Sequence, residues 1–336
     1  MYKNRPLRAL RSYPLAALAL VLSPLAIAGC DAQEIDEHGD ITFRPGGGWG
    51  CSHCGIVLGN SPNINGADLS DINLDGANIS GIKLKLGTTP GNRPFRLEVD
   101  PDTESFIGIN PQDPDDVLIK GAGFVGAKIV LEMPGAIDVA LEITDYDEEV
   151  ESWAQGGATL TAYRATYLSN NQYQSLCPST SPENQAFTLI LGETYKHGTG
   201  SQTGITAITK ALRSVTIACV GEAAAKMKLM DFHPLSNRGA DVDERMATLR
   251  MITADYCGDG TPYTASGVPV AWRDADNLVQ PPTSEDLLEA MWTADGARCL
   301  DTPRLTSLDL IHCQIPACED DRTFLSDDVW RTMLPY

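Results

Sequence analysis

Basic residues are scarce in this chain of 336 residues, which holds 25 Lys and Arg against 45 Asp and Glu and has a formal net charge of −20. Four of the basic residues lie within the first eleven positions, and no basic cluster follows them. Nucleic-acid binding requires Lys and Arg side chains that displace the counterions of the phosphates. We therefore expect no nucleic-acid partner, and a body of this charge is also unsuited to anionic lipid surfaces.

Complete catalytic patterns are missing as well. No serine stands in a nucleophile-elbow sequence, and the five histidines show no paired ligand spacing. The one weak catalytic candidate is Asp255, which with Tyr256 has the residue types of an acid/base pair. The favoured interpretation is structural: Asp255 holds a turn through backbone hydrogen bonds while Tyr256 packs against a disulfide. No cofactor is expected.

Metal ligands form only partial sets. Asp71, Asn73, Asp75 and Gly76 match the opening of a calcium loop, but Ile82 stands at the twelfth position, where such a loop has glutamate. Asp71, Asn73 and Asp75 are weak calcium candidates, and no metal site is predicted.

A zinc or redox site is the second partial match. Cys51-Ser52-His53-Cys54 supplies three zinc ligands or a redox pair, and zinc would require a fourth ligand from His312-Cys313. Structural disulfides are the favoured alternative.

The N-terminus has the pattern of an export signal. Basic residues precede an apolar run over Leu15–Ala28, and Ile27-Ala28-Gly29-Cys30 has the layout of a bacterial lipidation site. We predict a lipoprotein signal peptide over 1–29 and a mature chain that begins at a lipidated Cys30. The expected location is the cell envelope, with the membrane as a partner through Cys30 on the extracytoplasmic side. Asp31, which follows the lipidated cysteine, does not decide between placement in the inner and in the outer membrane.

The remaining cysteines are even in number, which in an exported protein indicates a disulfide framework. Their spacing alone leaves about 105 connectivities open. The disulfide candidates are Cys51, Cys54, Cys177, Cys219, Cys257, Cys299, Cys313 and Cys318.

A flexible tether is predicted over 30–60, because this stretch is acidic and then rich in glycine. Over 61–86, apolar residues recur every five positions. This segment resembles pentapeptide repeats, which fold as a four-sided β-solenoid. Five pentads make little more than one coil, so we expect the segment either to pack against the next unit as a cap or to extend as an arm. The apolar positions are Ile64, Leu69, Leu74, Ile79 and Leu84.

The fold class expected is α+β. Apolar residues alternate over 95–99, 137–143 and 187–191, which predicts half-buried antiparallel strands and a β-rich, sandwich-like region over 87–176. Turn residues at 111–114 and 134–135 separate these strands.

Helices are predicted in the C-terminal part. They span 219–230, 241–254 and 285–292, the second with the spacing of a capping box and the third after a capping Thr or Ser. The predicted C-terminal part is therefore helical and stapled by disulfides.

Ala254-Asp255-Tyr256-Cys257, with Gly258-Asp259-Gly260 behind it, resembles the ADYC domain, a bacterial family named for these four residues. The stretches Ala218–Gly221 and Asp295–Cys299 support the resemblance, which covers roughly 187–318. We assign 177–336 to an ADYC-like, cysteine-rich domain. The resemblance implies an exported domain of unknown function and carries no catalytic residues.

Two departures from the family pattern occur together. Met227 and Thr248 stand where the family pattern has cysteines. We predict that the two residues face one another, with a Cα separation short enough for a disulfide, about 7 Å or less.

Three functions fit these observations. The favoured one is a lipid-anchored extracytoplasmic binding or structural module whose protein or polymer ligand is unknown. The first alternative is an exported hydrolase that acts on envelope or extracellular polymer and uses Asp255. The second is a calcium-dependent adhesion protein.

Overall fold

The structure is a computed structural model that describes residues 62–334, apart from 65–66, 79, 170, 178–186, 198–204, 211–212, 221, 265–267, 269, 280–286 and 319–322. The predicted leader, Cys30, the tether, Cys51 and Cys54 lie outside the described residues. No helix of the described part is both long and apolar enough to span a membrane.

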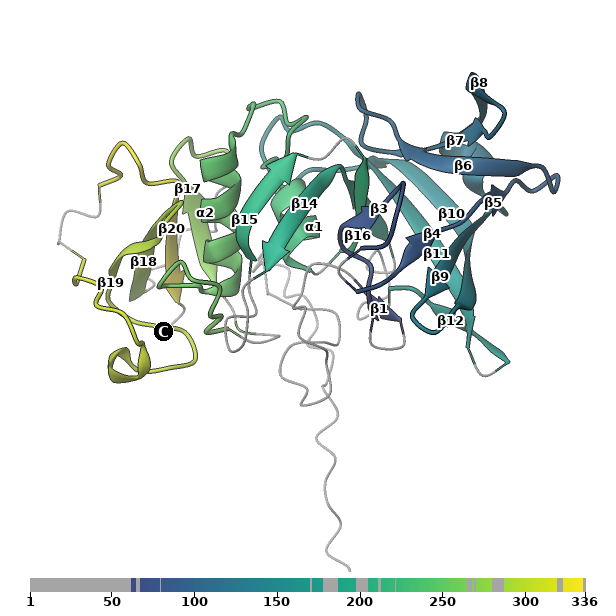
Figure 1. The fold of residues 1–336 in the computed structure, drawn as a ribbon. Coiled ribbons are helices and arrows are strands. Elements are labelled where there is room, and N and C mark those ends of the chain that lie inside the picture. Colours follow the sequence, from purple (N-terminus) through teal and green to yellow (C-terminus); the bar gives the residue numbers. More distant parts are fainter. Residues whose placement is uncertain are drawn as a thin grey trace, which may run out of the picture. The chain divides into compact units, whose positions relative to one another are not determined.

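A twelve-stranded antiparallel sheet dominates the first half of the described chain (Figure 1). Antiparallel β-structure is thereby confirmed, but the strands are hydrogen-bonded in one order instead of forming two separate sheets. In spatial order the sheet contains β3 (Ile72–Asn73), β16 (Ser214–Cys219), β13 (Thr188–Leu191), β11 (Leu160–Ser169), β10 (Ile137–Val150), β9 (Lys128–Met133), β5 (Gly87–Thr88), β6 (Pro94–Val99), β7 (Phe106–Asn110) and β8 (Asp113–Lys120), with β12 (Gln172–Ser175) paired to β11 and β4 (Lys83–Leu84) paired to β9.

The predicted turns connect neighbouring strands of this sheet. Pro111–Gln112 joins β7 to β8, and Pro134–Ala136 joins β9 to β10. Gly135 has φ +84° and Ala136 has φ +59°, so the second turn needs a residue without a side chain at its first left-handed position.

The pentad segment packs on this sheet. β1 (Asn63–Ile64) pairs antiparallel with β2 (Ala67–Asp68), while β3 and β4 join the large sheet. Ile64, Leu69 and Leu74 are buried in the core of the sheet. The segment therefore packs against the large sheet and does not extend as an arm.

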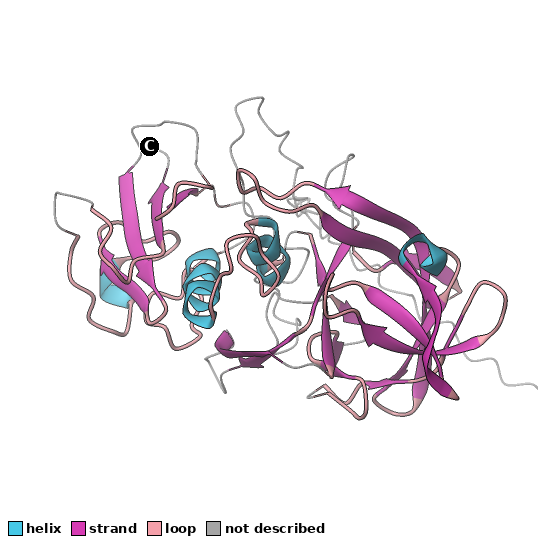
Figure 2. Ribbon diagram, turned by 90° about the horizontal axis from the view of Figure 1, so that it is seen from above, coloured by secondary structure: helices cyan, strands magenta, loops and turns pink. Residues whose placement is uncertain are grey.

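The second half of the described chain is less helical than predicted (Figure 2). Its two α-helices are α1 (Ala223–Leu229) and α2 (Val242–Thr253), and a four-stranded antiparallel sheet follows them. That sheet orders β17 (Ala271–Asp274), β20 (Trp330–Leu334), β18 (Leu287–Thr293) and β19 (Gly296–Leu300). A separate hairpin pairs β14 (Glu193–His197) with β15 (Ile205–Lys210), and the short 3-10 helices are η1 (Gly121–Phe124) and η2 (Leu308–Leu310).

The helix predicted over 285–292 is wrong, because 287–293 forms strand β18. Five consecutive residues from Leu288 to Trp292 are buried, and β18 is hydrogen-bonded to β19 and β20 on its two edges. A short apolar run is compatible with either structure, and here the pairing partners decide for the strand.

Two large apolar cores and one small cluster lie in the described chain, and β13 belongs to both large cores. Leu189 and Leu191 lie in the core around the helices, whereas Ile190 lies in the core of the large sheet. The strand predicted at 187–191 is confirmed as β13, but the prediction that it is half-buried is wrong, because all of β13 is buried. β13 and β16 also lie beyond residue 176, so the predicted boundary there cuts through one sheet.

Helices α1 and α2 pack against each other within the first of these cores. Met227 and Thr248, one on each helix, are both fully buried. The Thr248 hydroxyl accepts a hydrogen bond from Trp330 Nε1 at 2.8 Å. That Met227 and Thr248 face one another stays a prediction.

Disulfides are confirmed for six of the predicted cysteines. The pairs are Cys177–Cys219, Cys257–Cys313 and Cys299–Cys318. The first pair fastens the end of β16 to the segment after β12, and the other two fasten the segment 311–318 to the Ala254–Cys257 turn and to β19.

Candidate functional site at the Ala254–Cys257 turn

The turn begins where α2 ends. Asp241 caps the start of the helix in a complete capping box with Glu244, as predicted. Ala254 ends it in the left-handed region, with φ +52°, and the Asp255 amide donates to Arg250 O at 2.9 Å. A left-handed residue at this position reverses the chain direction. The following residues consequently run back past the end of the helix.

Asp255 is committed to this turn. Its Oδ1 accepts from the Asp259 amide at 3.1 Å, and its Oδ2 accepts from the Gly260 amide at 2.9 Å. The residue is only 2 % exposed, and burial raises the pKa of its carboxyl to about 6 although these bonds oppose the shift. Asp255 therefore holds the turn through backbone hydrogen bonds, as the structural interpretation predicts.

Tyr256 points into the core and does not pack on the disulfide as expected. Its ring stacks on Trp292 with centroids 5.3 Å apart. Its hydroxyl donates to Glu289 Oε1 at 2.6 Å and accepts from the Arg304 amide at 2.8 Å. Burial raises the pKa of this phenol, so Tyr256 stays protonated as a structural donor.

Backbone contacts fix the turn against the β18–β19 hairpin. The Ala297 amide donates to Tyr256 O at 3.0 Å. Gly258 has φ +69°, and a Cβ there would lie 2.7 Å from the carbonyl carbon of Asp295. A Cβ at Gly296 would lie 2.6 Å from Tyr256 O. Two chain segments can approach this closely only because neither residue has a side chain.

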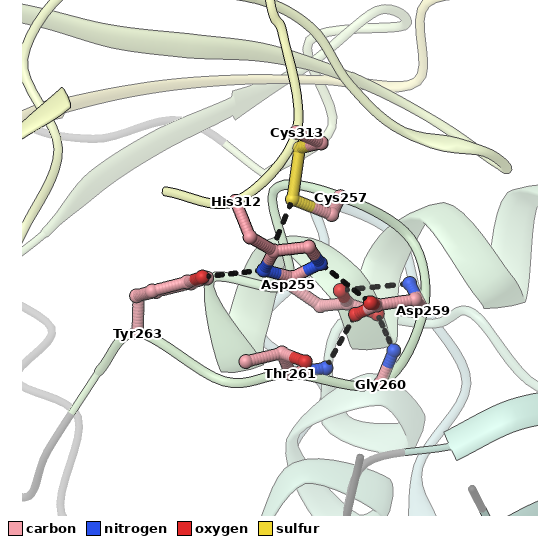
Figure 3. The surroundings of a disulfide bond; sticks show 8 residues. All are labelled: Asp255, Cys257, Asp259, Gly260, Thr261, Tyr263, His312 and Cys313. Atoms are coloured by element: carbon pink, nitrogen blue, oxygen red, sulfur yellow. Dashed lines mark hydrogen bonds and ion pairs between the residues drawn. A yellow bond between two sulfur atoms is a disulfide. The ribbon is translucent and has the colours of Figure 1, made fainter. Parts of the chain in front are cut away.

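A polar chain of three side chains lies beside the turn (Figure 3). His312 Nε2 is 2.7 Å from Asp259 Oδ2, and His312 Nδ1 is 3.0 Å from the Tyr263 hydroxyl. The His312 side chain is 50 % exposed. With its proton on Nε2, the imidazole donates to the Asp259 carboxylate and accepts from the Tyr263 phenol.

Sequence reasoning did not find this chain of Asp259, His312 and Tyr263. Asp259 and His312 are 53 positions apart, and the Cys257–Cys313 disulfide joins their segments. One signal was present in the sequence: Asp259 lies two positions after Cys257, and His312 lies directly before Cys313. The sequence pattern gives His312 a role only in a zinc site shared with Cys313, and Cys313 instead forms a disulfide, which is the favoured prediction for the cysteines.

The calcium candidates engage separate partners. Asp71 Oδ1 accepts from the Tyr195 amide at 2.8 Å, and burial raises the pKa of Asp71 to about 6. Asp75 is bound by the Arg213 guanidinium, while Asn73 Oδ1 accepts from the Asp75 amide. Among the residues that the structure describes, no group of three or more acidic, His or Cys side chains is placed to hold a metal ion.

An acidic cavity of about 570 Å³ lies at the opposite end of α2. Arg238 reaches into this lining with its guanidinium over the Phe232 ring, 3.9 Å from the centroid, and bonds Asp276 at 2.8 Å. Carboxylates dominate the lining, which therefore disfavours anionic ligands. They belong to Asp241, Asp243, Glu244, Asp276, Asp295, Asp327 and Asp328.

Comparison with known proteins identifies one family. The model of the ADYC domain matches residues 121–306, which is more than half of the chain. The match begins ahead of the predicted domain start at 177 and includes β9, β10 and β11 of the large sheet. No curated protein and no solved structure matches the chain. The chain, with Ala254-Asp255-Tyr256-Cys257 at the end of its second helix, belongs to the ADYC domain family.

Proposed function

We propose that this protein is a lipid-anchored extracytoplasmic module that binds or supports other envelope components and has no hydrolytic activity of its own. The observation that carries the proposal is the use of Asp255. Both of its carboxylate oxygens accept backbone N–H groups, and it is almost fully buried. A catalytic carboxylate must reach the reacting group of a substrate.

The rest of the family motif supports the same interpretation. Ala254 reverses the chain, Tyr256 bonds core groups, and Cys257 forms a disulfide. Disulfides persist in oxidising compartments outside the cytoplasm, which supports export. The pattern that ends at Cys30 supports an acyl anchor, and we retain the pentapeptide-like segment as part of the body that this anchor would carry.

Asp255→Ala distinguishes the module from the hydrolase alternative. Removal of both acceptors takes away the acceptor of the buried Gly260 N–H and one bond of the half-buried Asp259 N–H, so the free energy of unfolding should fall by about 1–3 kcal/mol at pH 5. The folded-state pKa of Asp255 is raised, so the carboxyl contributes stability that is present at low pH and lost as pH rises through about 6. The loss caused by the substitution should therefore be smaller at pH 8.

Denaturant unfolding at pH 5 and pH 8 measures both effects. Asp309→Ala, at an exposed carboxylate in the same half of the chain, is the matched control and should change stability by less than about 0.5 kcal/mol. Unchanged stability in Asp255→Ala would instead favour a carboxylate held ready for catalysis.

Cys30→Ser tests the anchor. The full chain expressed in a bacterium should incorporate labelled palmitate and sediment with membranes, and Cys30→Ser should lose both properties. The reason is that stable anchoring requires the buried methylenes of more than one acyl chain. Cys51→Ser, which replaces another early cysteine, serves as the control and should keep the label. A Cys30→Ser protein that still carries acyl label would contradict the proposal.

A further inference from the structure

The three described disulfides differ in exposure. Cys177 and Cys219 are both buried, at 0 % and 4 % exposed, and Cys299 is buried at 4 %. Cys257 and Cys313 are both half-buried. Of the disulfides in the described part of the chain, Cys257–Cys313 is therefore the one in which neither residue is buried. Thiol–disulfide exchange requires a thiolate to reach one sulfur in line with the S–S bond.

His312 adds an acid/base group to this disulfide. Its Nδ1 lies 3.9 Å from Cys257 Sγ. Figure 3 marks this contact with a dashed line. The Asp259 carboxylate, 2.7 Å from Nε2, holds the ring in place, in the way that a carboxylate orients the histidine of a hydrolytic triad. An imidazolium beside a sulfur stabilises the thiolate that forms there.

We propose that Cys257–Cys313 is an exchangeable disulfide with His312 as its catalytic residue, and that its reaction partner is a dithiol reductant. This inference does not depend on the proposed anchor or on the module function. Asp255 and Asp259, two positions before and two positions after Cys257, are acidic residues that oppose a thiolate at this site. Arg250 Nε lies 3.9 Å from Asp255 Oδ2 and offsets that carboxylate.

The contacts also give the reaction a direction. A thiolate of the partner attacks Cys313 Sγ and forms a new S–S bond with it. The Cys257–Cys313 bond breaks, and its electron pair remains on Cys257 Sγ, beside the imidazole of His312. The second thiol of the partner then attacks the mixed disulfide and releases Cys313. The partner is oxidised to its disulfide by two electrons, and its two protons end on Cys257 and Cys313.

Both halves of the site stay in place after the bond opens. Asp255 and Tyr256, the two residues before Cys257, are held in place by side-chain hydrogen bonds that do not involve sulfur. The segment after Cys313 remains tied to β19 by Cys299–Cys318, and the Cys318 amide donates to Asp301 Oδ1 at 2.8 Å. The reduced form should therefore keep its fold and reoxidise.

Timed reduction of the intact protein by dithiothreitol, quenched by alkylation and followed by mass spectrometry of the cysteine peptides, tests the proposal. We expect the peptides of Cys257 and Cys313 to be labelled before those of the other two described pairs. His312→Gln should slow this reduction roughly tenfold, because the leaving sulfur of Cys257 loses the acid/base group beside it. The other two disulfides provide internal controls whose rates should not change.

Gln314→Ala is the matched variant, since Gln314 is exposed and adjacent to Cys313. It should reduce at the wild-type rate, and the melting temperature of both variants should match the wild type before reduction. The proposal is overturned if another of the three disulfides opens first, or if His312→Gln reduces as fast as the wild type or faster.

Discussion

Gly258→Ala is expected to lower the free energy of unfolding by more than about 4 kcal/mol, the upper end of what single substitutions do. Two causes act together. The residue has φ +69°, where an L side chain is strained, and the new Cβ would lie 2.7 Å from the carbonyl carbon of Asp295. Asp295 belongs to the backbone of the β18–β19 turn, so relief would require the turn and the hairpin to separate.

Gly239→Ala is the control for the backbone strain alone. Gly239 has φ +68°, but nothing lies within 4 Å of a Cβ placed there. This variant should lose only about 1 kcal/mol, the cost of a left-handed residue. Chemical denaturation of both variants measures the difference. Equal losses would show that the close approach of the turn to the hairpin is not rigid.

Lys228→Met should have the second large effect. Lys228 Nζ on α1 lies 2.9 Å from Glu104 Oε2 in the β6–β7 loop and 2.6 Å from Ile190 O. The exposed fractions of the two side chains are 2 % and 6 %. Removing one partner of a buried ion pair leaves an uncompensated charge, which costs about 3–5 kcal/mol.

Glu104 explains why the loss is large. Burial alone would raise the pKa of this carboxyl, but Lys228 and His233 lower it to about 2. A carboxyl whose folded-state pKa is lowered contributes stability above its unfolded value of 4.5, and this stability is lost as pH falls through about 2. Without Lys228 the stabilisation at neutral pH should disappear.

The double variant Lys228→Met/Glu104→Gln tests this explanation. Because it removes the buried negative charge as well, it should be more stable than Lys228→Met alone in urea unfolding at pH 7. Lys83→Met at the surface pair Lys83–Glu132, whose side chains are 56 % and 25 % exposed, is the control and should cost less than about 1 kcal/mol. A double variant less stable than the single one would show that Glu104 is not the cause.

Local patterns predicted the elements that depend on neighbouring residues. The alternation at 95–99 and 137–143 became β6 and β10, and the capping box at Asp241 became the start of α2. The even cysteine count was followed by disulfides among six of them. The strands and the capping box depend on residues a few positions apart, and the disulfides depend on export and on the number of cysteines. The sequence shows both kinds of information directly.

Local patterns failed where the neighbours were distant. The run at 287–292 satisfies a helix as well as a strand, and only pairing with β19 and β20 decided between them. β13 and β16, which lie beyond residue 176, return to the first sheet. Alternation reports which faces of a strand are polar but not which sheet the strand joins.

The candidate site shows the same division. The family motif, the acidic charge, the cysteines and the turn-holding role of Asp255, whose bond partners lie four and five residues ahead, follow from the chain itself. Folding was needed to pair Cys257 with Cys313 and to place His312 between Asp259 and Tyr263. The physical reason is that the role of a carboxylate, a thiol or an imidazole depends on the groups within hydrogen-bond distance. Here those groups come from segments about fifty residues apart.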